Sequence, residues 1–488
     1  MDYKRRNFLK TAGLAGLGIT GSQLFAASRH IQPTNSLNPF QPKQYSSNVP
    51  SFNMCGYAAP KLKTVRIGYI GLGNRGSAAV IRMAYIEGVE IKAICDIRQE
   101  KTAAVTDKLT NTIHHPFVYQ GSELSWKELC ERDDIDLVYI ATPWYLHTPM
   151  AVYAMNCQKH VCVEVPAAQT IDECWELVET SENTKKHCMM LENACYDQFK
   201  LLVLNMVRQG LFGEIIHCEG AYIHDLLAGN FAKDKYYDMW RLKENSHRNG
   251  NLYPTHGIGP ACQILNINRG DRMDYLVSVS SDDFMMGKMA KKLAEKDSFY
   301  KPYAELTYRG NINTSIIKTH LGKTIMLQHD VTSPRPKSGG YLVSGTKGTA
   351  LQYPTPGWIS FANETLPEEW KTYPANEWLP MDEFKKLEEK FNPEILKRMG
   401  TLAKEIGGHG GMDLLMDWRT IDCLRNGLPL DQNVYDAALW SSITPLSEWS
   451  VNNSKMIEVP DFTREAWKSN QPVNLSLDKG GNTKIINQ

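Results

Sequence analysis

One glycine-rich turn limits the possible folds of this chain more than any other feature. The apolar run "VRIGYI" leads into Gly71, Gly73 and Gly76, spaced as G-x-G-x-x-G, and a helical stretch, "SAAVIRMAYI", follows. A second apolar run, "VEIKAICD", ends at Asp96. In this order the glycines allow a tight turn that brings the backbone and a helix N-terminus close to a pyrophosphate, while the acid binds the adenosine ribose. The pattern predicts an NAD-binding Rossmann domain, because a carboxylate at this point repels the 2′-phosphate of NADP.

The alternation of strands and helices continues beyond Asp96. Strands are expected at 137–141 and 161–164, and the loops after them, "TPWYLH" and "EVPAA", are expected to border the nicotinamide. A further strand is expected to end near Asn193. We therefore expect the Rossmann domain over residues 61–190.

The second half of the chain has a different pattern. Three antiparallel strands are expected at 304–310, 314–321 and 324–331, and a hairpin at 341–353. A helix is expected to begin after the glycines at 407–411 and to end at Gly427. The expected fold class is α/β: a Rossmann domain, then a C-terminal substrate-binding α/β domain over 191–488 with an open, mostly antiparallel sheet.

Composition excludes some classes of partner. The formal net charge is zero, so the chain lacks the basic surplus that binding to nucleic acid or an anionic membrane requires. Several of its 11 cysteines lie inside apolar runs, which is typical of buried thiols and not of a disulfide framework. The sequence has no metal-binding spacing such as CxxC or HExxH, and we expect no metal site.

The N-terminus resembles an export signal. Arg5 and Arg6 precede a short, Gly- and Ala-rich apolar stretch that ends in small residues at 26–28. We expect a twin-arginine-type signal over 1–28, an extended Pro- and Asn-rich lead-in over 29–60, and a periplasmic or envelope location. The alternative is a membrane-anchoring helix preceded by basic residues. The apolar stretch is short for a transmembrane helix, which needs about 20 residues.

A pair of polar residues in the second half indicates a catalytic site. Tyr253 and His256 lie in "NLYPTHGIGP", a turn stiffened by Pro and Gly that leads into a helix. A rigid backbone beside two titratable side chains favours a catalytic role for both.

These motifs resemble a known superfamily. The order G-x-G-x-x-G, acid, T-P-x-x-x-H and E-x-P is similar to that of the Gfo/Idh/MocA sugar and polyol dehydrogenases, and the resemblance covers essentially everything after the lead-in. Two positions depart from it. Val165 stands where those dehydrogenases usually have a lysine, and Leu252 where they usually have an aspartate. Both departures count against a simple dehydrogenase.

One branch of the superfamily fits better. The segments "EVPAA", "ENACY", "YPTHGIGP", "NINRGDR" and "GGHGGMD" resemble the NAD-dependent α-N-acetylgalactosaminidases of glycoside hydrolase family 109. The resemblance implies cofactor contacts at Asn74, Arg75, Asp96, Trp144, Tyr145, Leu146, His147, Glu164, Val165 and Asn193, beside the three glycines. It implies sugar contacts at Tyr222, Arg241, Tyr253, Pro254, Thr255 and His256. We add His409 as a further candidate, and Lys337 at the position of an expected sugar-binding tyrosine, with Tyr341 close by.

The resemblance also implies a mechanism. The sugar is oxidised at C3, the C2 hydrogen is removed, the C1 oxygen leaves, water adds, and the cofactor returns its hydride, so hydrolysis retains configuration without net redox change. From the residues we expect Tyr196 as the base at C2, with His256 assisting at the C3 hydroxyl. Such an enzyme can work outside the cytoplasm only if it keeps its NAD, and we expect the lead-in or the 225–250 loop to cover the cofactor.

Other functions stay open. The main alternative is an exported NAD-dependent sugar oxidoreductase of the same superfamily, and the third is an inactive relative that only binds carbohydrate. The expected partner in all three is a small carbohydrate or a glycan terminus. A homo-oligomeric state stays open.

Overall fold

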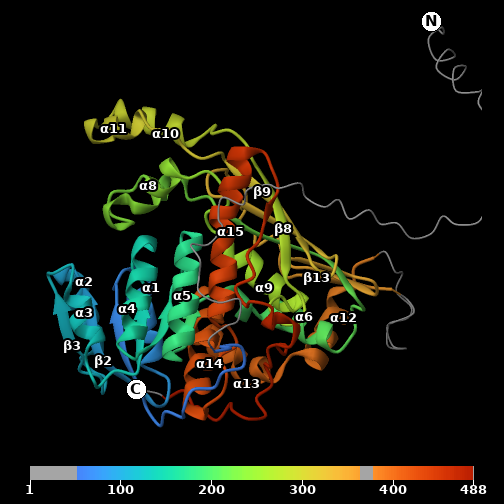
Figure 1. Ribbon diagram of the computed structural model, residues 1–488, viewed down its shortest axis with the longest axis horizontal. Helices are drawn as coiled ribbons and strands as arrows, with labels where there is room; N and C mark the ends of the chain where they lie inside the picture. Colours follow the sequence, from blue (N-terminus) through green and yellow to red (C-terminus); the bar gives the residue numbers. More distant parts are fainter. Residues whose placement is uncertain (1–51, 363–376, 487–488) are drawn as a thin grey trace, which may run out of the picture. The chain divides into compact units, whose positions relative to one another are not determined.

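Two β-sheets organise the chain (Figure 1). The structure, a computed structural model, describes residues 52–362 and 377–486. The expected signal at 1–28 and most of the expected lead-in lie outside these described residues. Within them, no helix combines the length and the apolar character needed to cross a membrane.

The first sheet has six parallel strands in the order β3-β2-β1-β4-β5-β6. Its strands are β1 Val65–Ile70, β2 Val89–Asp96, β3 Phe117–Gln120, β4 Leu137–Ile140, β5 His160–Val163 and β6 Cys188–Met190. The helices between them are α1 Asn74–Met83, α2 Gln99–Leu109, α3 Ser125–Cys130, α4 His147–Asn156 and α5 Ile171–Thr184. All residues of β4, β5 and β6 are buried, as expected for a parallel sheet covered by helices on both faces. The Rossmann prediction is confirmed.

The second sheet has eight strands in the order β13-β12-β11-β7-β10-β9-β8-β14 and is mostly antiparallel. Only the β7–β10 pair is parallel among its described pairs. The strands are β7 Ile215–Ile223, β8 Met273–Ser280, β9 Ile312–Thr319, β10 Thr324–Asp330, β11 Leu342–Gly345, β12 Gly348–Leu351, β13 Trp358–Phe361 and β14 Ile457–Glu458. The expected open, mostly antiparallel sheet is confirmed.

The remaining helices connect and cover the sheets. They are α6 Gln198–Arg208, α7 Leu227–Asn230, α8 Trp240–His247, α9 Thr255–Leu265, α10 Met286–Ala294, α11 Lys301–Ala304, α12 Met381–Phe391, α13 Glu394–Ile406, α14 Met412–Asn426 and α15 Val434–Asn453. The long helix α15 runs between the two sheets (Figure 1), packs on both α5 and β8, and is buried over most of its length. A helix buried all round joins the two halves into one hydrophobic core.

One predicted strand is wrong. Residues 304–310 form no strand; Ala304 ends the short helix α11, and residues 305–311 run as a loop to β9. Their place in the sheet belongs to β8, whose alternating residues Leu276 and Ser278 point inward while Val277 and Val279 are exposed. Strand β8 is not among the strands expected from the sequence, although its segment "DYLVSVSS" has the period-2 pattern of a half-buried strand.

Candidate functional site

The glycine-rich turn has the geometry that a dinucleotide requires. Gly71 has φ +87°, and a Cβ on Gly76 would lie 1.8 Å from the carbonyl oxygen of Gly71, so neither position tolerates a side chain. A Cβ on Gly73 would meet no atom within 4 Å, which leaves the turn open at that point. Helix α1 begins at Asn74 with no side-chain cap and no acid in its first turn, so its free N–H groups are available to an anion. These residues fit the pyrophosphate of NAD.

Asp96 ends β2 beside this turn and is buried. Its Oδ2 accepts a hydrogen bond from the Leu72 amide at 2.7 Å, and its Oδ1 accepts one from the Arg98 amide at 2.9 Å. Because each carboxylate oxygen has two lone pairs, the side chain can hold the turn and still accept from ribose hydroxyls. The arrangement fits the predicted role at the adenosine ribose.

Arg75 ties the turn to the second half of the chain. Its Nε donates to Glu164 Oε1 at 2.9 Å, and its Nη1 donates to Asp413 Oδ2 at 2.8 Å, at the start of α14. Asp413 Oδ1 also accepts from Asn193 Nδ2 at 2.5 Å. Burial by itself raises the pKa of Asp413, but the hydrogen bond from His409 and the charges of Arg75 and Arg82 outweigh it and lower that pKa well below its usual range. An ionised, fully buried carboxylate therefore joins two of the predicted cofactor residues, Arg75 and Asn193, and also His409.

The residues of the loop after β4 differ in burial and in the contacts they make. Trp144 is buried and lies in the aromatic wall described below, Leu146 packs on the core, and Tyr145 is 50% exposed. His147 is buried, with Nδ1 2.7 Å from the Pro166 carbonyl oxygen and Nε2 2.8 Å from that of Thr142. His147 thus fixes the two loops that border the nicotinamide position, and it has no nitrogen left for the cofactor.

Two of the predicted sugar contacts, Tyr222 and Tyr253, form an aromatic wall with Trp144. The rings of Tyr222 and Tyr253 lie 4.7 Å apart, and Tyr253 stacks on Trp144 at 5.5 Å. The guanidinium of Arg241 lies 5.1 Å from the Tyr253 ring and 5.3 Å from the Trp144 ring. Among the described residues Arg241 has no carboxylate partner, so these rings provide its electrostatic contacts. Aromatic faces with one donor fork are typical of a carbohydrate site.

His256 stands beside this wall and has a buried partner. Its ring lies 5.5 Å from that of Tyr222 and 5.0 Å from that of Tyr253. Its Nδ1 lies 2.6 Å from Glu192 Oε1, and Glu192 is fully buried at the end of the Rossmann sheet. Burial alone raises the pKa of Glu192, but the charge of His256 and the hydrogen bonds it accepts outweigh this and lower it. The ionised carboxylate can only accept, so Nδ1 carries the proton and Nε2 is the basic nitrogen.

Glycines allow this contact between the two halves. A Cβ on Gly259 would lie 2.9 Å from Cγ of Glu192, and one on Gly257 would lie 2.8 Å from the Ala221 nitrogen in β7. Helix α9 therefore sits close enough to β7 and to Glu192 for His256, in its first turn, to reach the carboxylate.

The expectation that Tyr196 is the base at C2 does not fit the structure. Tyr196 is 1% exposed, and its hydroxyl donates to Asp431 Oδ2 at 3.1 Å, within a cluster that Arg419 completes. Burial and then the charge of Asp431 raise its pKa well above the usual range. A phenol held in the core beside a carboxylate cannot take a proton from a sugar in the cleft.

The other predicted contacts are spread more widely. Pro254 and Thr255 are buried at the start of α9, where they set the position of His256. Lys337 is exposed, and Tyr341 is 1% exposed in the core, so Tyr341 cannot replace the expected sugar-binding tyrosine. His409, 45% exposed, lies by Arg75 and Asp413, on the cofactor side of the site. Val165 is buried at the end of β5 and brings no titratable group.

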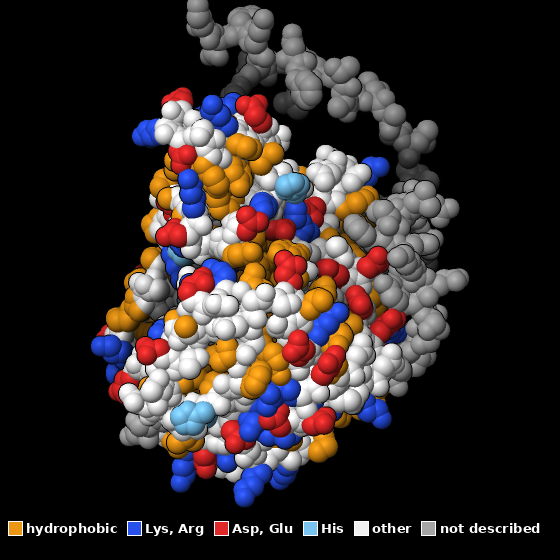
Figure 2. All heavy atoms as spheres, turned by 90° about the vertical axis from the view of Figure 1, so that its left-hand side faces the viewer, with side chains coloured by type: hydrophobic (Ala, Val, Ile, Leu, Met, Phe, Trp, Pro, Cys, Tyr) orange, Lys and Arg blue, Asp and Glu red, His pale blue; other side chains and the backbone are white. Residues whose placement is uncertain are grey.

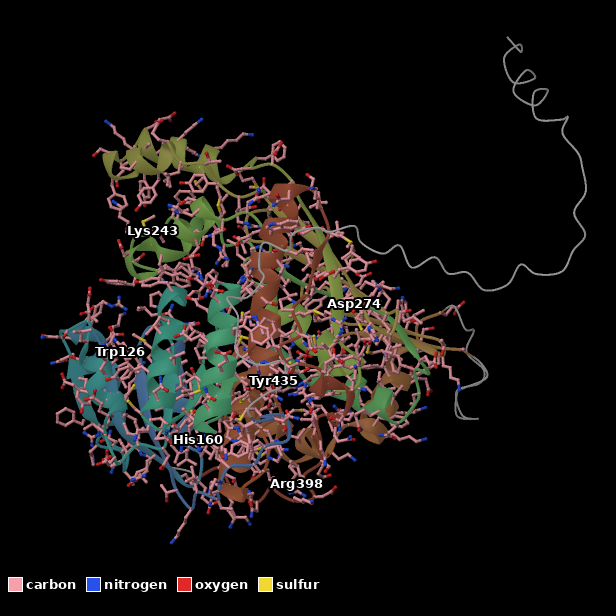
Figure 3. All side chains as sticks on the ribbon, in the orientation of Figure 1. Trp126, His160, Lys243, Asp274, Arg398 and Tyr435 are labelled. Carbon is pink, nitrogen blue, oxygen red and sulfur yellow. The ribbon has the colours of Figure 1, made fainter. Side chains whose placement is uncertain are left out.

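A segment that we call the strap, residues 226–250, reaches from the second half onto the Rossmann half (Figure 1). The Arg98 guanidinium lies 5.3 Å from the Tyr237 ring, and Trp144 meets Trp240 edge to face at 4.8 Å. Gln169 Nε2 donates to Glu244 Oε2 at 2.9 Å. The strap thus touches the loops after β2, β4 and β5. In Figure 3 the label on Lys243 marks α8, the helix of the strap, which lies above α1 and α5. In Figure 2 hydrophobic side chains gather at the same height of the molecule.

The described part of the lead-in lies elsewhere. The Met54 amide donates to the Tyr435 hydroxyl at 3.2 Å, on α15, and the Tyr57 ring lies 5.0 Å from that of His187. Of the two segments expected to cover the cofactor, the strap is therefore the one whose described residues reach the cofactor loops.

Sequence reasoning missed Glu192 and Asp413 as site residues. Both were part of quoted segments, "ENACY" and "GGHGGMD", but neither has a local pattern that shows its partner, since each meets its partner across 64 or more positions. A charged residue directly after a buried apolar run, as Glu192 is after β6, is the signal that was available. Among the described residues, no group of three His, Cys, Asp or Glu side chains could hold a metal ion.

Comparisons with known proteins agree with this geometry. The family described as "Glycosyl hydrolase 109, C-terminal domain" matches residues 196–469, and "Oxidoreductase family, NAD-binding Rossmann fold" matches residues 65–192. A glycosyl hydrolase family 109 protein of Shewanella pealeana is 46% identical over 482 residues, 97% of this chain and 99% of its own length. An alpha-N-acetylgalactosaminidase of Bacteroides fragilis is 49% identical over 422 residues, 85% of this chain and 96% of its own length.

Solved structures share the fold. A levoglucosan dehydrogenase in complex with NADH has a TM-score of 0.62 at 17% identity, covering 82% of this chain and 100% of its own. A scyllo-inositol dehydrogenase with bound NAD(H) and scyllo-inositol has a TM-score of 0.56 at 13% identity, covering 81% of this chain and 99% of its own.

Proposed function

Since the chain belongs to glycosyl hydrolase family 109, we propose that it is a retaining α-N-acetylgalactosaminidase that keeps its NAD through the catalytic cycle. The observation that carries the proposal is the His256–Glu192 pair beside the aromatic wall, next to a turn that fits a dinucleotide. The relative named alpha-N-acetylgalactosaminidase supports the substrate class.

The cofactor would be held by the first half of the chain. The turn at Gly71–Gly76 and the N-terminus of α1 fit its pyrophosphate, Asp96 fits the adenosine ribose, and Glu164, Val165 and Asn193 line the nicotinamide side. When bound, NAD supplies the reversible oxidation of the sugar at C3, which acidifies the hydrogen on C2.

His256 acts on that hydrogen. Its Nε2 takes the C2 proton while the bond from C1 to the leaving oxygen breaks, and Glu192 stabilises the imidazolium that forms. After water adds at C1, the same nitrogen returns a proton to C2. Tyr222, Tyr253 and Arg241 hold the sugar against the wall, with Arg241 donating to its oxygens. NAD-dependent glycosidases do not need the usual pair of carboxylates.

The location is part of the proposal. A folded protein that carries its own recycled nucleotide suits the twin-arginine route, and Arg5-Arg6 with the following apolar stretch supports export to the periplasm or cell envelope. Fractionation of cells that make the full chain, with and without the Arg5→Lys and Arg6→Lys exchanges, tests this location.

An assay without added nucleotide tests the activity. Purified protein is given aryl glycosides of N-acetylgalactosamine, and the released aglycone is measured together with the absorbance of NADH. Aglycone with no net NADH supports the hydrolase, whereas net NADH equal to product would show a sugar oxidoreductase. No turnover and no nucleotide in the protein would leave only carbohydrate binding.

A further inference from the structure

The strap over 226–250 has a small hydrophobic core of its own. Its residues Phe231 and Leu242 join Met286, Ala290 and Tyr300, from the connection between β8 and β9, in a cluster separate from the main core. The Tyr300 hydroxyl donates to the Phe231 carbonyl oxygen at 2.7 Å. In Figure 1 this connection, with α10 and α11, lies beside α8. Because this packing does not involve the Rossmann half, the strap can move away from that half without unfolding.

Where the strap meets the second sheet, buried polar atoms lack partners. A cavity of about 20 Å³, counted as the space open to the centre of a water-sized sphere, lies between Asn230, Arg241 and Asn245 of the strap and His329 of β10. Arg309 adjoins it, since its amide donates to the Asn245 carbonyl oxygen at 2.9 Å. Seven buried atoms here have no hydrogen-bond partner among the described residues: Asn230 Oδ1 and Nδ2, Arg241 Nε, Asn245 Oδ1, His329 Nδ1, and Arg309 Nε and Nη1.

One water cannot satisfy this polar cluster. A cavity of this size holds about one molecule, and a buried water makes about two to four hydrogen bonds. At least three of the seven atoms therefore stay unpaired while the strap is closed. Unpaired buried donors and acceptors destabilise the state that holds them, and native proteins have few. Opening the strap would relieve this cost, because solvent would then reach the cluster.

The contacts that oppose opening all involve side chains. Among the residues that the structure describes, no backbone-to-backbone hydrogen bond joins the strap to the Rossmann half. The contacts there include Arg98 with Tyr237, Trp144 with Trp240, and Gln169 with Glu244 and Arg248. Side-chain contacts of this kind break in local openings that leave the rest of the fold intact.

We propose that the strap is a cap that its nucleotide closes. In protein free of nucleotide the strap opens readily, because opening hydrates the unpaired cluster, and NAD enters. Bound NAD then supplies the additional contacts that hold the strap shut. One site can thus admit its nucleotide and afterwards keep it, which a permanently closed strap could not do. The inference rests on the NAD binding of the proposed function and is independent of hydrolysis.

Hydrogen–deuterium exchange of the full protein, with and without NAD, measures the opening. The backbone amides of residues 226–250 should exchange at least about tenfold more slowly when NAD is bound. The amides of α12, which lies away from the site, should exchange equally in both states. Equal exchange of the strap with and without NAD would overturn the proposal.

The Asn230→Leu variant tests the unpaired cluster. Leucine has nearly the shape of asparagine and removes two unpaired atoms, so the closed strap should become more stable. Without nucleotide, the strap amides should exchange roughly 3- to 10-fold more slowly, and NAD should bind and dissociate more slowly by a similar factor. The melting temperature should stay the same or rise. Unchanged or faster amide exchange in the strap would overturn the proposal.

Asn205→Leu is the matched control. Asn205 lies on α6, and its Nδ2 donates to the Phe391 carbonyl oxygen at 2.7 Å. Because this asparagine has a partner, its substitution should lower the melting temperature. The amide exchange of the strap and the rates of NAD binding should not change. If both variants alter the strap equally, the effect comes from lost stability in general and the proposal is wrong.

These measurements separate the proposal from the proposed function, since they need no glycoside. A strap that NAD closes, in a protein that hydrolyses no glycoside, would overturn only the hydrolase. Hydrolysis by a protein whose strap exchanges equally with and without NAD would overturn only the cap. A protein that binds no NAD would contradict both.

Discussion

At the scale of single residues, the account depends on the pairing of His256 with Glu192. The carboxylate fixes the proton on Nδ1 and leaves Nε2 as the basic nitrogen, which is how a second residue makes a histidine an effective base. In the proposed mechanism the two side chains act differently: His256 contacts the substrate, and Glu192 positions His256.

The Glu192→Gln exchange separates these two roles. Glutamine keeps the hydrogen bond to Nδ1 but not the charge that stabilises the imidazolium, so kcat should fall by roughly 10- to 100-fold with little change in KM. An unchanged kcat would remove Glu192 from the mechanism.

Tyr196→Phe tests the corrected assignment of the base. The hydroxyl donates to buried Asp431, so its loss should cost about 1–2 kcal/mol of the free energy of unfolding. Exchange of the C2 hydrogen with deuterated water should continue at close to the natural rate, while His256→Asn should abolish it. Loss of exchange in Tyr196→Phe, in protein that is still folded, would restore Tyr196 as the base.

Sequence alone identified the residue types of the site but not all of its pairs. Local sequence motifs contain Gly71, Asp96, Tyr253 and His256. The role of each of these residues could therefore be predicted from the residues next to it in the sequence. Tyr196 follows Asn193 by three residues and was expected to be the base at C2, yet the chain turns there and the ring lies in the core. Which way a side chain points after a strand end depends on packing against α14 and its neighbours, which no local pattern encodes.

At the scale of elements, we propose that the strap over 226–250 keeps a bound nucleotide in place. With association near ~10⁶ M⁻¹s⁻¹, a Kd of about 1 nM would still release NAD within tens of minutes. The strap contacts the loops after β2 and β4, which lie on the two sides of the point where the strand order of the parallel sheet reverses. These contacts must break before a nucleotide bound there can leave.

Trp240→Ala should therefore speed the release of nucleotide. The exchange removes the edge-to-face contact with Trp144 and one of the aromatic rings that pack against the Arg241 guanidinium. We expect roughly tenfold faster dissociation of NADH, measured as the loss of its bound-state fluorescence after excess NAD is added to prevent rebinding. Tyr275→Ala, an aromatic residue 37% exposed on the outer face of β8, is the control and should leave the rate unchanged. Equal rates in both variants would show that the strap does not retain the cofactor.

The elements of the Rossmann half were predictable, and those of the second half less so. Strands buried on both faces read as apolar runs, and β4 lies within one residue of its predicted bounds. In the second half, the strand predicted at residues 304–310 is wrong, and β8 was not predicted. The exposed face of β8 also has apolar residues and its buried face has a serine, so polar and apolar residues alternate only weakly along it. The parallel pairing of β7 with β10, between residues some 107 positions apart in the chain, follows from long-range packing.

At the scale of the whole molecule, stability should fall in mild acid. His160 and His187 are buried beside each other low in the Rossmann half, where Figure 3 labels His160, with rings 5.1 Å apart. Burial lowers the pKa of His160 to about 4 and that of His187 to about 3. Because the unfolded chain takes up these protons near pH 6.5, the stability they contribute is complete above that pH and is lost as the pH falls toward the folded values.

The expected slope is about 1 kcal/mol per pH unit for each histidine between pH 6 and 4.5. Urea unfolding at several pH values measures it, and His187→Gln should reduce the slope while the exposed His115→Gln should not. Identical slopes in all three proteins would mean that other groups control acid stability.

The central claim is that hydrolysis proceeds by removal and return of the C2 proton over a cofactor that ends each cycle unchanged. Hydrolysis of an aryl α-N-acetylgalactosaminide in deuterated water, followed by mass spectrometry and NMR of the released sugar, tests it most directly. The account predicts one deuterium at C2 of the product, at every turnover and without added nucleotide. A product with only hydrogen at C2 would contradict it.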